Sequence, residues 1–114
     1  MITITNVGTA YDTVAASRGL GIQDLDLTGI ASLVFRVRWN KVGTGTLSWQ
    51  LWNETDGSEL ARIDDAAAAG DNKTQAVIVS GLTLTGEKTV RVRAKSTVAG
   101  DDPVFYGASV LTRP

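Results

Sequence analysis

The sequence predicts an all-β protein, an antiparallel β-sandwich of jelly-roll type with about eight strands. Composition is the first reason: the 114 residues include 14 Thr, 12 Val and 6 Ile, and β-branched side chains favour strands. The second reason is pattern, because apolar and polar residues alternate along most of the chain and turn signals recur about every 8 to 12 residues. The length is typical of one domain, so we expect residues 1–114 to form a single sandwich.

The clearest strand is predicted over 33–40, where inward and outward residues alternate strictly. Its inward face carries Leu33, Phe35, Val37 and Trp39. A glycine turn at 43–45 leads to a second strand at 47–52. The turn-forming residues at 53–57 then connect to a short strand at 60–63.

The second half of the chain contains the one predicted helix, over 64–70, with Asp64 as its N-cap and Gly70 as its stop. Glycine turns separate the strands that follow it. Further strands are predicted over 76–79, 82–84, 90–95 and 104–111, and less regular strand patterns cover 2–7, 11–17 and 22–27.

A Leu-Thr-Gly pattern occurs twice, at 25–29 and at 82–86, and each copy precedes an Arg-Val-Arg strand. The two final glycines lie 86 − 29 = 57 residues apart, half the chain length. This two-fold pattern suits a jelly roll built from two Greek keys. The alternative is that a chain rich in Leu, Thr and Val repeats such words by chance.

Composition argues against an enzyme. The chain has no cysteine and no histidine, which excludes a thiolate nucleophile, an imidazole base and the usual zinc or haem ligands. The carboxylate pairs at 64–65 and 101–102 lie in predicted turns, where solvated aspartates are more common than catalytic or calcium-binding ones. The Asp-rich segment 24–29 begins like a calcium loop, but Phe35 stands where such a loop needs glutamate. We expect no catalytic, cofactor-binding or metal-binding residue.

Two short basic rows are the main candidate binding features. The 11 basic and 12 acidic residues give a net charge of −1, yet basic residues gather on one face of two predicted strands. These are Arg36 and Arg38 on the first strand, and Arg91, Arg93 and Lys95 on the second. The rows either meet an acidic partner or keep the sheet soluble and discourage edge pairing. Strand order decides whether they merge into one patch.

Trp52 also has two interpretations. It follows Trp49 by three residues, so it falls on the opposite strand face from Trp49 and Leu51. It either packs outside the main core or forms an exposed contact for a sugar or a protein.

The run Trp49-Gln50-Leu51-Trp52-Asn53-Glu54-Thr55-Asp56-Gly57-Ser58-Glu59-Leu60 resembles a hairpin of small β-sandwich domains in bacteriophage structural proteins. The segments 82–88 and 106–108 resemble the second half of those domains. The resemblance implies a virion protein, either a capsid decoration (cement) protein or a domain of a tail appendage. The chain begins with Met1 and ends just after its last predicted strand, so we expect a complete small protein, which favours decoration.

The resemblance further implies a homo-oligomer, with a trimer favoured, that binds the major capsid protein on the outer surface of the virion. The protein would be made in the bacterial host cytoplasm, since no signal peptide or spanning run is present, and we expect neither nucleic acid nor membrane as a partner. The candidate interface residues are Ile2, Ile4, Arg36, Arg38, Trp52, Arg91, Arg93 and Lys95. The alternative function is a carbohydrate- or receptor-binding module that uses Trp52.

Overall fold

The computed structural model describes residues 2–3, 8–9, 11–13 and 22–114, and every regular element in these ranges is a strand. The strands are β1 (Ile2–Thr3), β2 (Asp12–Thr13), β3 (Ile22–Asp26), β4 (Ser32–Lys41), β5 (Leu47–Asn53), β6 (Ser58–Asp65), β7 (Gly70–Val79), β8 (Glu87–Ser96) and β9 (Val104–Arg113). The molecule measures 40 × 25 × 22 Å. In the ranges described, no helix is long and apolar enough to cross a membrane.

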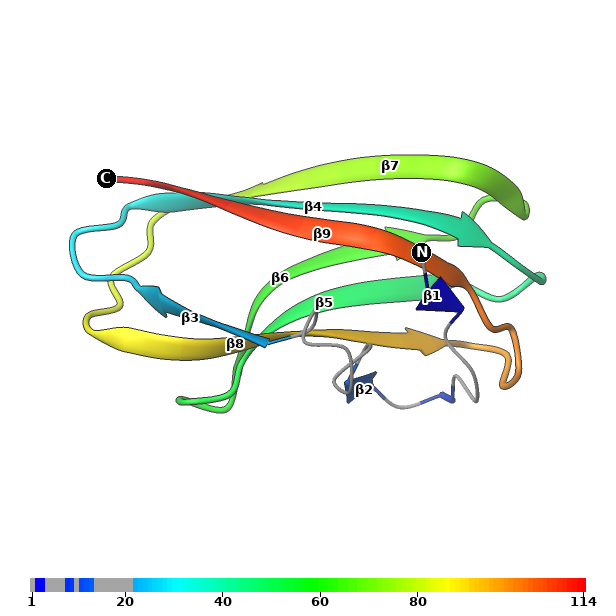
Figure 1. Ribbon diagram of the computed structural model, residues 1–114, viewed down its shortest axis with the longest axis horizontal. Helices are drawn as coiled ribbons and strands as arrows, with labels where there is room; N and C mark the ends of the chain where they lie inside the picture. The colour runs from blue at the N-terminus through cyan, green and yellow to red at the C-terminus, as the bar shows by residue number, and fades with distance from the viewer. Residues whose placement is uncertain (1, 4–7, 10, 14–21) are drawn as a thin grey trace.

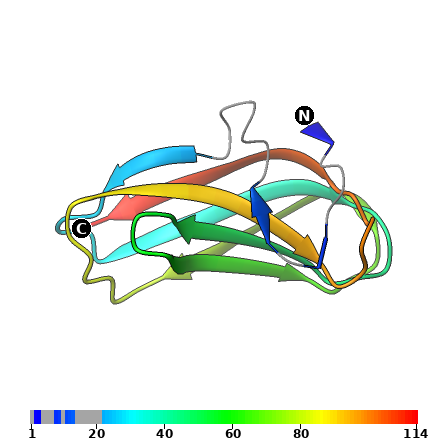
Figure 2. The ribbon, with the colours of Figure 1, turned by 90° about the horizontal axis from the view of Figure 1, so that it is seen from below.

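The strands form two antiparallel sheets stacked face to face (Figure 1). One sheet has the order β1-β9-β4-β7, and we call it the β4 sheet; the other has the order β2-β8-β5-β6, with β3 also paired to β8, and we call it the β8 sheet. Figure 2 looks from the β8 side, where the green strand β5 lies between β8 and β6.

The strand pairs are nested along the chain, which is the topology of a jelly roll. β5 pairs with β6, β4 with β7, β8 with β3 and β2, and β9 with β1. Successive pairs enclose one another, as when a long hairpin is rolled up into two sheets. The predicted fold class is therefore confirmed.

The core follows the alternation seen in β4. The inward side chains Leu33, Phe35, Val37 and Trp39 are buried, while Arg36 and Arg38 between them are exposed. Between the sheets, the Trp49 ring centroid lies 6.0 Å from that of Trp39 and 5.4 Å from that of Phe105. The predicted core positions of Trp39 and Trp49 are thus confirmed, and aromatic packing joins the two layers.

The predicted helix over 64–70 is wrong. Asp65 ends β6 and Gly70 begins β7, so only the loop 66–69 lies between two strands. Four residues are too few to nucleate a helix. The backbone N–H of Ala67 donates to the Asp65 carboxylate, and this contact closes a turn where a helix cap was expected.

The predicted strand over 82–84 is also wrong, because residues 80–86 form a loop. Leu82 and Leu84 nevertheless pack against the core, which explains their alternation. The two Leu-Thr-Gly copies meet at one end of the sandwich: the N–H of Gly86 donates to Thr28 Oγ1, and that of Leu27 donates to the Gly86 carbonyl. The repeat marks two touching turns, not two equivalent strands.

Most of the remaining predicted strands lie within observed ones, but the predicted strand at 22–27 runs one residue past the end of β3 at Asp26. β7 begins at Gly70, six residues before the predicted strand at 76–79, because polar residues on an edge strand can face solvent on both sides. Of the predicted strands at 2–7 and 11–17, only Ile2–Thr3 and Asp12–Thr13 are described as strand. Residues 4–7 and 14–17 lie outside the described part of the chain.

Candidate functional site

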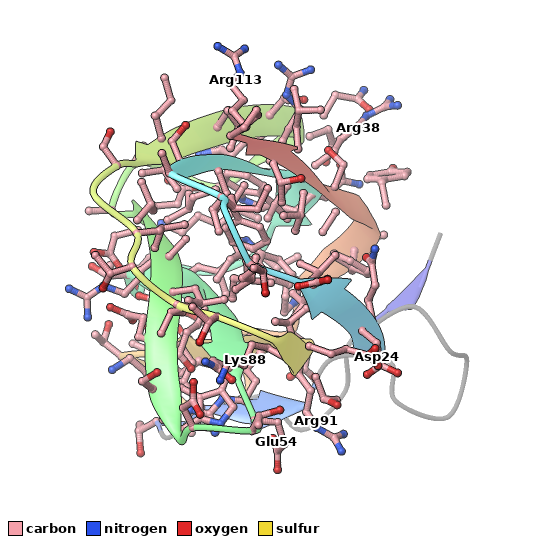
Figure 3. All side chains as sticks on the ribbon, turned by 90° about the vertical axis from the view of Figure 1, so that its left-hand side faces the viewer. Asp24, Arg38, Glu54, Lys88, Arg91 and Arg113 are labelled. Carbon is pink, nitrogen blue, oxygen red and sulfur yellow. The ribbon has the colours of Figure 1, made fainter. Side chains whose placement is uncertain are left out.

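Strand order places the two basic rows on different sheets. Arg36 and Arg38 belong to β4, whereas Arg91, Arg93 and Lys95 belong to β8. Figure 3 shows Arg38 and Arg113 pointing away from one layer and Arg91 lying on the far side of the other. The two rows therefore do not merge into one basic patch.

The β8 row is paired within the molecule. Arg91 Nε lies 3.0 Å from Glu54 Oε2. Arg93 Nε donates to Gln50 Oε1 at 2.8 Å, and Lys95 Nζ lies 4.4 Å from the Tyr11 ring centroid. These cations therefore have partners within the molecule, and their predicted interface role stays a prediction.

Trp52 lies in the same cluster. The guanidinium carbon of Arg93 is 4.0 Å from the centroid of its ring, and the tryptophan is half-buried. Arg93 thus covers a face of the ring that a sugar would otherwise stack on. The predicted contact role of Trp52 stays a prediction.

The outward surface of the β4 sheet, which we call the β4 face, differs from the surface around the β8 row in its side chains and its charge. Registered pairs such as Arg36 with Ala76 and with Ser109 place these side chains on one side. The β4 face comprises Val34, Arg36, Arg38, Asn40, Thr74, Ala76, Ile78, Tyr106, Ser109, Leu111 and Arg113.

Charge is divided unevenly between the sheets. The strands of the β4 sheet carry five basic residues and one acidic residue, Asp71, which gives 5 − 1 = +4. The strands of the β8 sheet carry five basic and seven acidic residues, which gives 5 − 7 = −2. The net charge of −1 therefore conceals a molecule with one positive sheet.

The β4 face also has an exposed apolar end. Ile78 is 69% exposed and Leu111 is 57% exposed, and both are registered opposite Val34 on the central strand. Three aliphatic side chains on adjacent strands thus form a continuous apolar patch next to Arg36. Exposed apolar surface beside arginine is typical of protein-binding surfaces.

A shallow hollow of about 330 Å³ opens beside the arginines. It is lined by Arg36, Arg38, Tyr106, Gly107, Ala108 and Ser109. The register of β4 and β9 shifts between the pairs Arg38–Gly107 and Trp39–Phe105, and Tyr106 is the extra residue. Phe105 is buried and Tyr106 is not. This bulge turns the tyrosine outward beside Arg38.

Hydrogen bonds hold Arg38 in place. Arg38 Nη2 donates to Asn72 Oδ1 at 2.9 Å, and the Asn72 N–H donates to Asn40 Oδ1 at 2.8 Å. Asn40 Nδ2 donates to the Tyr106 hydroxyl at 3.0 Å, and the Arg38 guanidinium lies 5.0 Å from the Tyr106 ring centroid. These contacts form a closed ring of four residues around one side of the hollow.

Asp65 belongs to one of the two carboxylate pairs, 64–65 and 101–102, that an enzyme would have to use, and it is buried. Its neighbours are donors: Lys73 Nζ lies 3.0 Å from Oδ2, Trp39 Nε1 donates to Oδ2, and the Ala67 N–H donates to Oδ1. Burial alone would raise the pKa of Asp65, but the bonds from Lys73, Trp39 and Ala67 reverse this effect and lower it.

The shallow pocket beside Asp65 contains no second carboxylate among its lining residues, so the pairing that an enzyme with two carboxylates would need does not occur there. Asp24 and Asp26, from the rejected calcium loop, are exposed on β3. In the described ranges, no three acidic side chains come together as metal ligands. The absence of enzymatic activity stays a prediction.

The N-terminal interface candidates are only partly described. Ile2 pairs with Phe105 in β1, while Ile4 lies outside the described residues. Sequence reasoning missed Asn72, Ile78 and Leu111 as surface candidates. The sequence did contain a sign that Ile78 is exposed. Its neighbours Val77 and Val79 occupy inward positions, so Ile78 between them must point outward.

No protein-family model matches the chain, and no curated protein matches it. Among solved structures, it is similar to TmCBM61 in complex with β-1,4-galactotriose (10% identity, TM-score 0.48, covering 81% of this chain and 61% of that one). It is similar to the enzymatically active domain of bacteriophage CBA120 tailspike protein 4 (15% identity, TM-score 0.49, covering 81% of this chain and 13% of that one). A family 35 carbohydrate-binding module from an environmental isolate is similar over the full length of both chains (15%, TM-score 0.45). With TM-scores below 0.5, these likenesses carry no argument about function.

Proposed function

We propose that the protein is a non-enzymatic virion structural protein, a capsid decoration protein that docks through its β4 face on the outer surface of a phage head. The observation that carries this proposal is the composition of that face. Arg36 and Arg113 have no carboxylate partner among the described residues, and they flank the exposed side chains of Ile78 and Leu111.

This composition supports docking to a protein more than solvation alone. Interface cores are enriched in arginine, tyrosine and large apolar residues and are depleted in lysine and acids. The β4 face fits that description, since Asp71 is the one acidic residue on the strands that form it. A positive sheet also steers the molecule toward an acidic surface.

Docking of this kind would stabilise a shell without chemistry. A protein that binds the assembled capsid and not its separated subunits stabilises the assembled state by mass action. The lack of histidine and cysteine and the engagement of Asp65 by Lys73 and Trp39 support a role without catalysis.

Co-sedimentation with purified empty capsids of its phage tests the proposal. We expect the wild-type protein to pellet with capsids at micromolar concentration. Ile78→Ser should raise Kd by about tenfold or more, because burial of such a side chain contributes roughly 1.5–3 kcal/mol. Val98→Ser, which removes an exposed valine from a loop outside the β4 face, should bind like wild type.

Failure of the wild-type protein to pellet would refute the decoration role. Analytical ultracentrifugation of the free protein would measure whether it is the trimer that the resemblance implies.

The second candidate is a carbohydrate- or receptor-binding module of a tail appendage. Its aromatic anchor would be Trp52, and the guanidinium of Arg93 over that ring counts against it. Binding on a glycan array that Trp52→Ala abolishes and Ile78→Ser leaves unchanged would favour this candidate over decoration.

A further inference from the structure

We propose that the hollow beside Arg36, Arg38 and Tyr106 recognises a carboxylate side chain on an extended, acidic segment of the partner protein. The inference rests on the proposed function for the class of partner, since it treats the β4 face as a docking surface. It goes further in naming the group that is bound and the residues that bind it.

Arg38 is preorganised for this task. Its guanidinium is held by Asn72 on one side and lies over the Tyr106 ring, which Asn40 fixes through the hydroxyl. Asn72 has a positive φ of 54°, a conformation that asparagine tolerates better than most residues. A guanidinium fixed in this way loses little freedom when it binds an anion, and its remaining N–H groups stay available.

Arg36 supplies the second donor. It lies two residues from Arg38 on the same strand face, and its registered neighbours, Ala76 and Ser109, carry no charge. Its side chain has no hydrogen bond or ion pair with any described residue, in contrast to Arg91 and Arg93 on the other sheet. A carboxylate placed between the two guanidiniums would receive charge-assisted bonds from both.

The floor of the hollow leaves room for the ligand. Gly107 stands opposite Arg38 in the register, and a Cβ at this position would meet no atom within 4 Å. Ala108 and Ser109 continue the floor with small side chains. The floor therefore leaves space for a side chain of the ligand.

The surroundings favour a peptide over a sugar acid. Arg38 covers a face of the Tyr106 ring, so the aromatic platform that a sugar would stack on is reduced. The apolar patch of Val34, Ile78 and Leu111 begins two residues along β4 from Arg36. Two residues is also the repeat of side chains on one side of an extended chain, so an acidic residue two positions from an aliphatic one fits both features.

The capped peptide Leu-Ser-Glu-Ser-Leu tests this without a capsid, because its pattern reads the same in both directions. We would titrate it into the ¹⁵N-labelled protein and follow the arginine Nε–Hε signals by NMR. We expect the Arg36 and Arg38 signals to shift with an affinity on the order of millimolar. The control peptide, which has glutamine in place of the glutamate and which we call the glutamine twin, should bind about tenfold more weakly.

Variants locate the site. Arg36→Gln should weaken peptide binding about tenfold, and Arg38→Lys should also weaken it because a lysine lacks the planar fork. Arg113→Gln removes the same charge from the other end of the β4 face and should change the affinity less than twofold.

Equal binding of the glutamine twin, or unmoved signals of Arg36 and Arg38, would overturn the inference. Tighter binding of glucuronate than of the peptide would overturn the choice of a peptide ligand. Since no capsid takes part, peptide binding without capsid pelleting would refute the decoration role alone, and pelleting that survives in Arg36→Gln with no peptide binding would refute the carboxylate site alone.

Discussion

Replacing Asp65 with asparagine should destabilise the protein far more than the same change at the adjacent Asp64. Asp65 is 6% exposed. Both of its carboxylate oxygens accept bonds, Oδ2 from Trp39 Nε1 and Oδ1 from the Ala67 N–H, while Lys73 Nζ approaches both. An asparagine amide offers only one acceptor oxygen. Its NH₂ group would therefore face one of the donors that now bond the carboxylate.

The size of the loss follows from these contacts. A charge-assisted hydrogen bond contributes roughly 1.5–3 kcal/mol, and a buried donor left without a partner costs about 1–3 kcal/mol. Because Lys73 remains partly exposed and can regain water, we take the low end of each range and expect a loss of about 2.5 kcal/mol in the free energy of unfolding. Asp64 is half-exposed; it accepts a bond from the Ser48 hydroxyl and pairs with the exposed Arg62. An asparagine can keep the first contact, so Asp64→Asn should cost under about 1 kcal/mol.

Urea unfolding, followed by tryptophan fluorescence, measures both variants. With a denaturant slope of about 1.5 kcal/mol per molar, Asp65→Asn should lower the midpoint by about 2 M. The pKa of Asp65 is lowered below its ordinary value of 3.8 in the folded state. Its contribution is therefore complete above the unfolded pKa and is lost as the pH falls through the lower, folded pKa.

The stability difference between wild type and Asp65→Asn should accordingly be largest above pH 4 and shrink below it. A midpoint change under 0.5 M at pH 7, or a difference that stays constant down to pH 2, would refute the role assigned to the Asp65 contacts.

Three further changes test turns between strands. Gly43→Ala should cost about 2 kcal/mol, seen as a drop in Tm of about 8 °C, because φ is +84° and the new Cβ would lie 2.1 Å from Asp101 Cγ. Gly57→Ala, with φ of +66° but open space around its Cβ, should lose about half as much, and equal losses would contradict the steric argument. Asn53→Ala removes the buried amide that bonds Asp56 through both its oxygen and its nitrogen, and should cost about 1–2 kcal/mol in chemical unfolding. Hydrogen bonds from Lys88 and Asn53 lower the pKa of Asp56, so this change should raise that pKa in a carboxyl NMR titration, and an unchanged value would count against the contact.

Local pattern predicted the strands well where the two sides of a strand differ in environment. In β4, successive side chains alternate between the core and solvent, so Val37 is buried and its neighbours Arg36 and Arg38 are exposed. Successive side chains point to opposite sides of the strand. The sequence of one strand is therefore enough to predict which of its residues are buried. The same rule failed at 82–84, where Leu82 and Leu84 pack on the core from a loop.

Long-range contacts account for what the sequence could not predict. The loop 66–69 looks helical in isolation, but Lys41 donates to the carbonyl of Ala67 and Lys73 to that of Ala68. Lys41 lies on β4 and Lys73 on β7, and a helix prediction based on residues 64–70 alone does not include their contacts with the loop. The ring around Arg38 has the same character, since it joins β4, β7 and β9 through Asn40, Asn72 and Tyr106.

In the two basic rows, the neighbouring strands determine whether the arginines of the same local motif find partners within the molecule. Arg36 and Arg93 both occupy the Arg-Val-Arg motif, on β4 and β8. β8 lies beside β5, which supplies Gln50 and Trp52 as partners for Arg93. β4 lies between β7 and β9, whose only acidic residue is Asp71 at one end. The nested pairing of the jelly roll thus separates the charges of a nearly neutral chain into one sheet whose arginines are paired within the molecule and one positive sheet on which the side chain of Arg36 has no partner among the described residues.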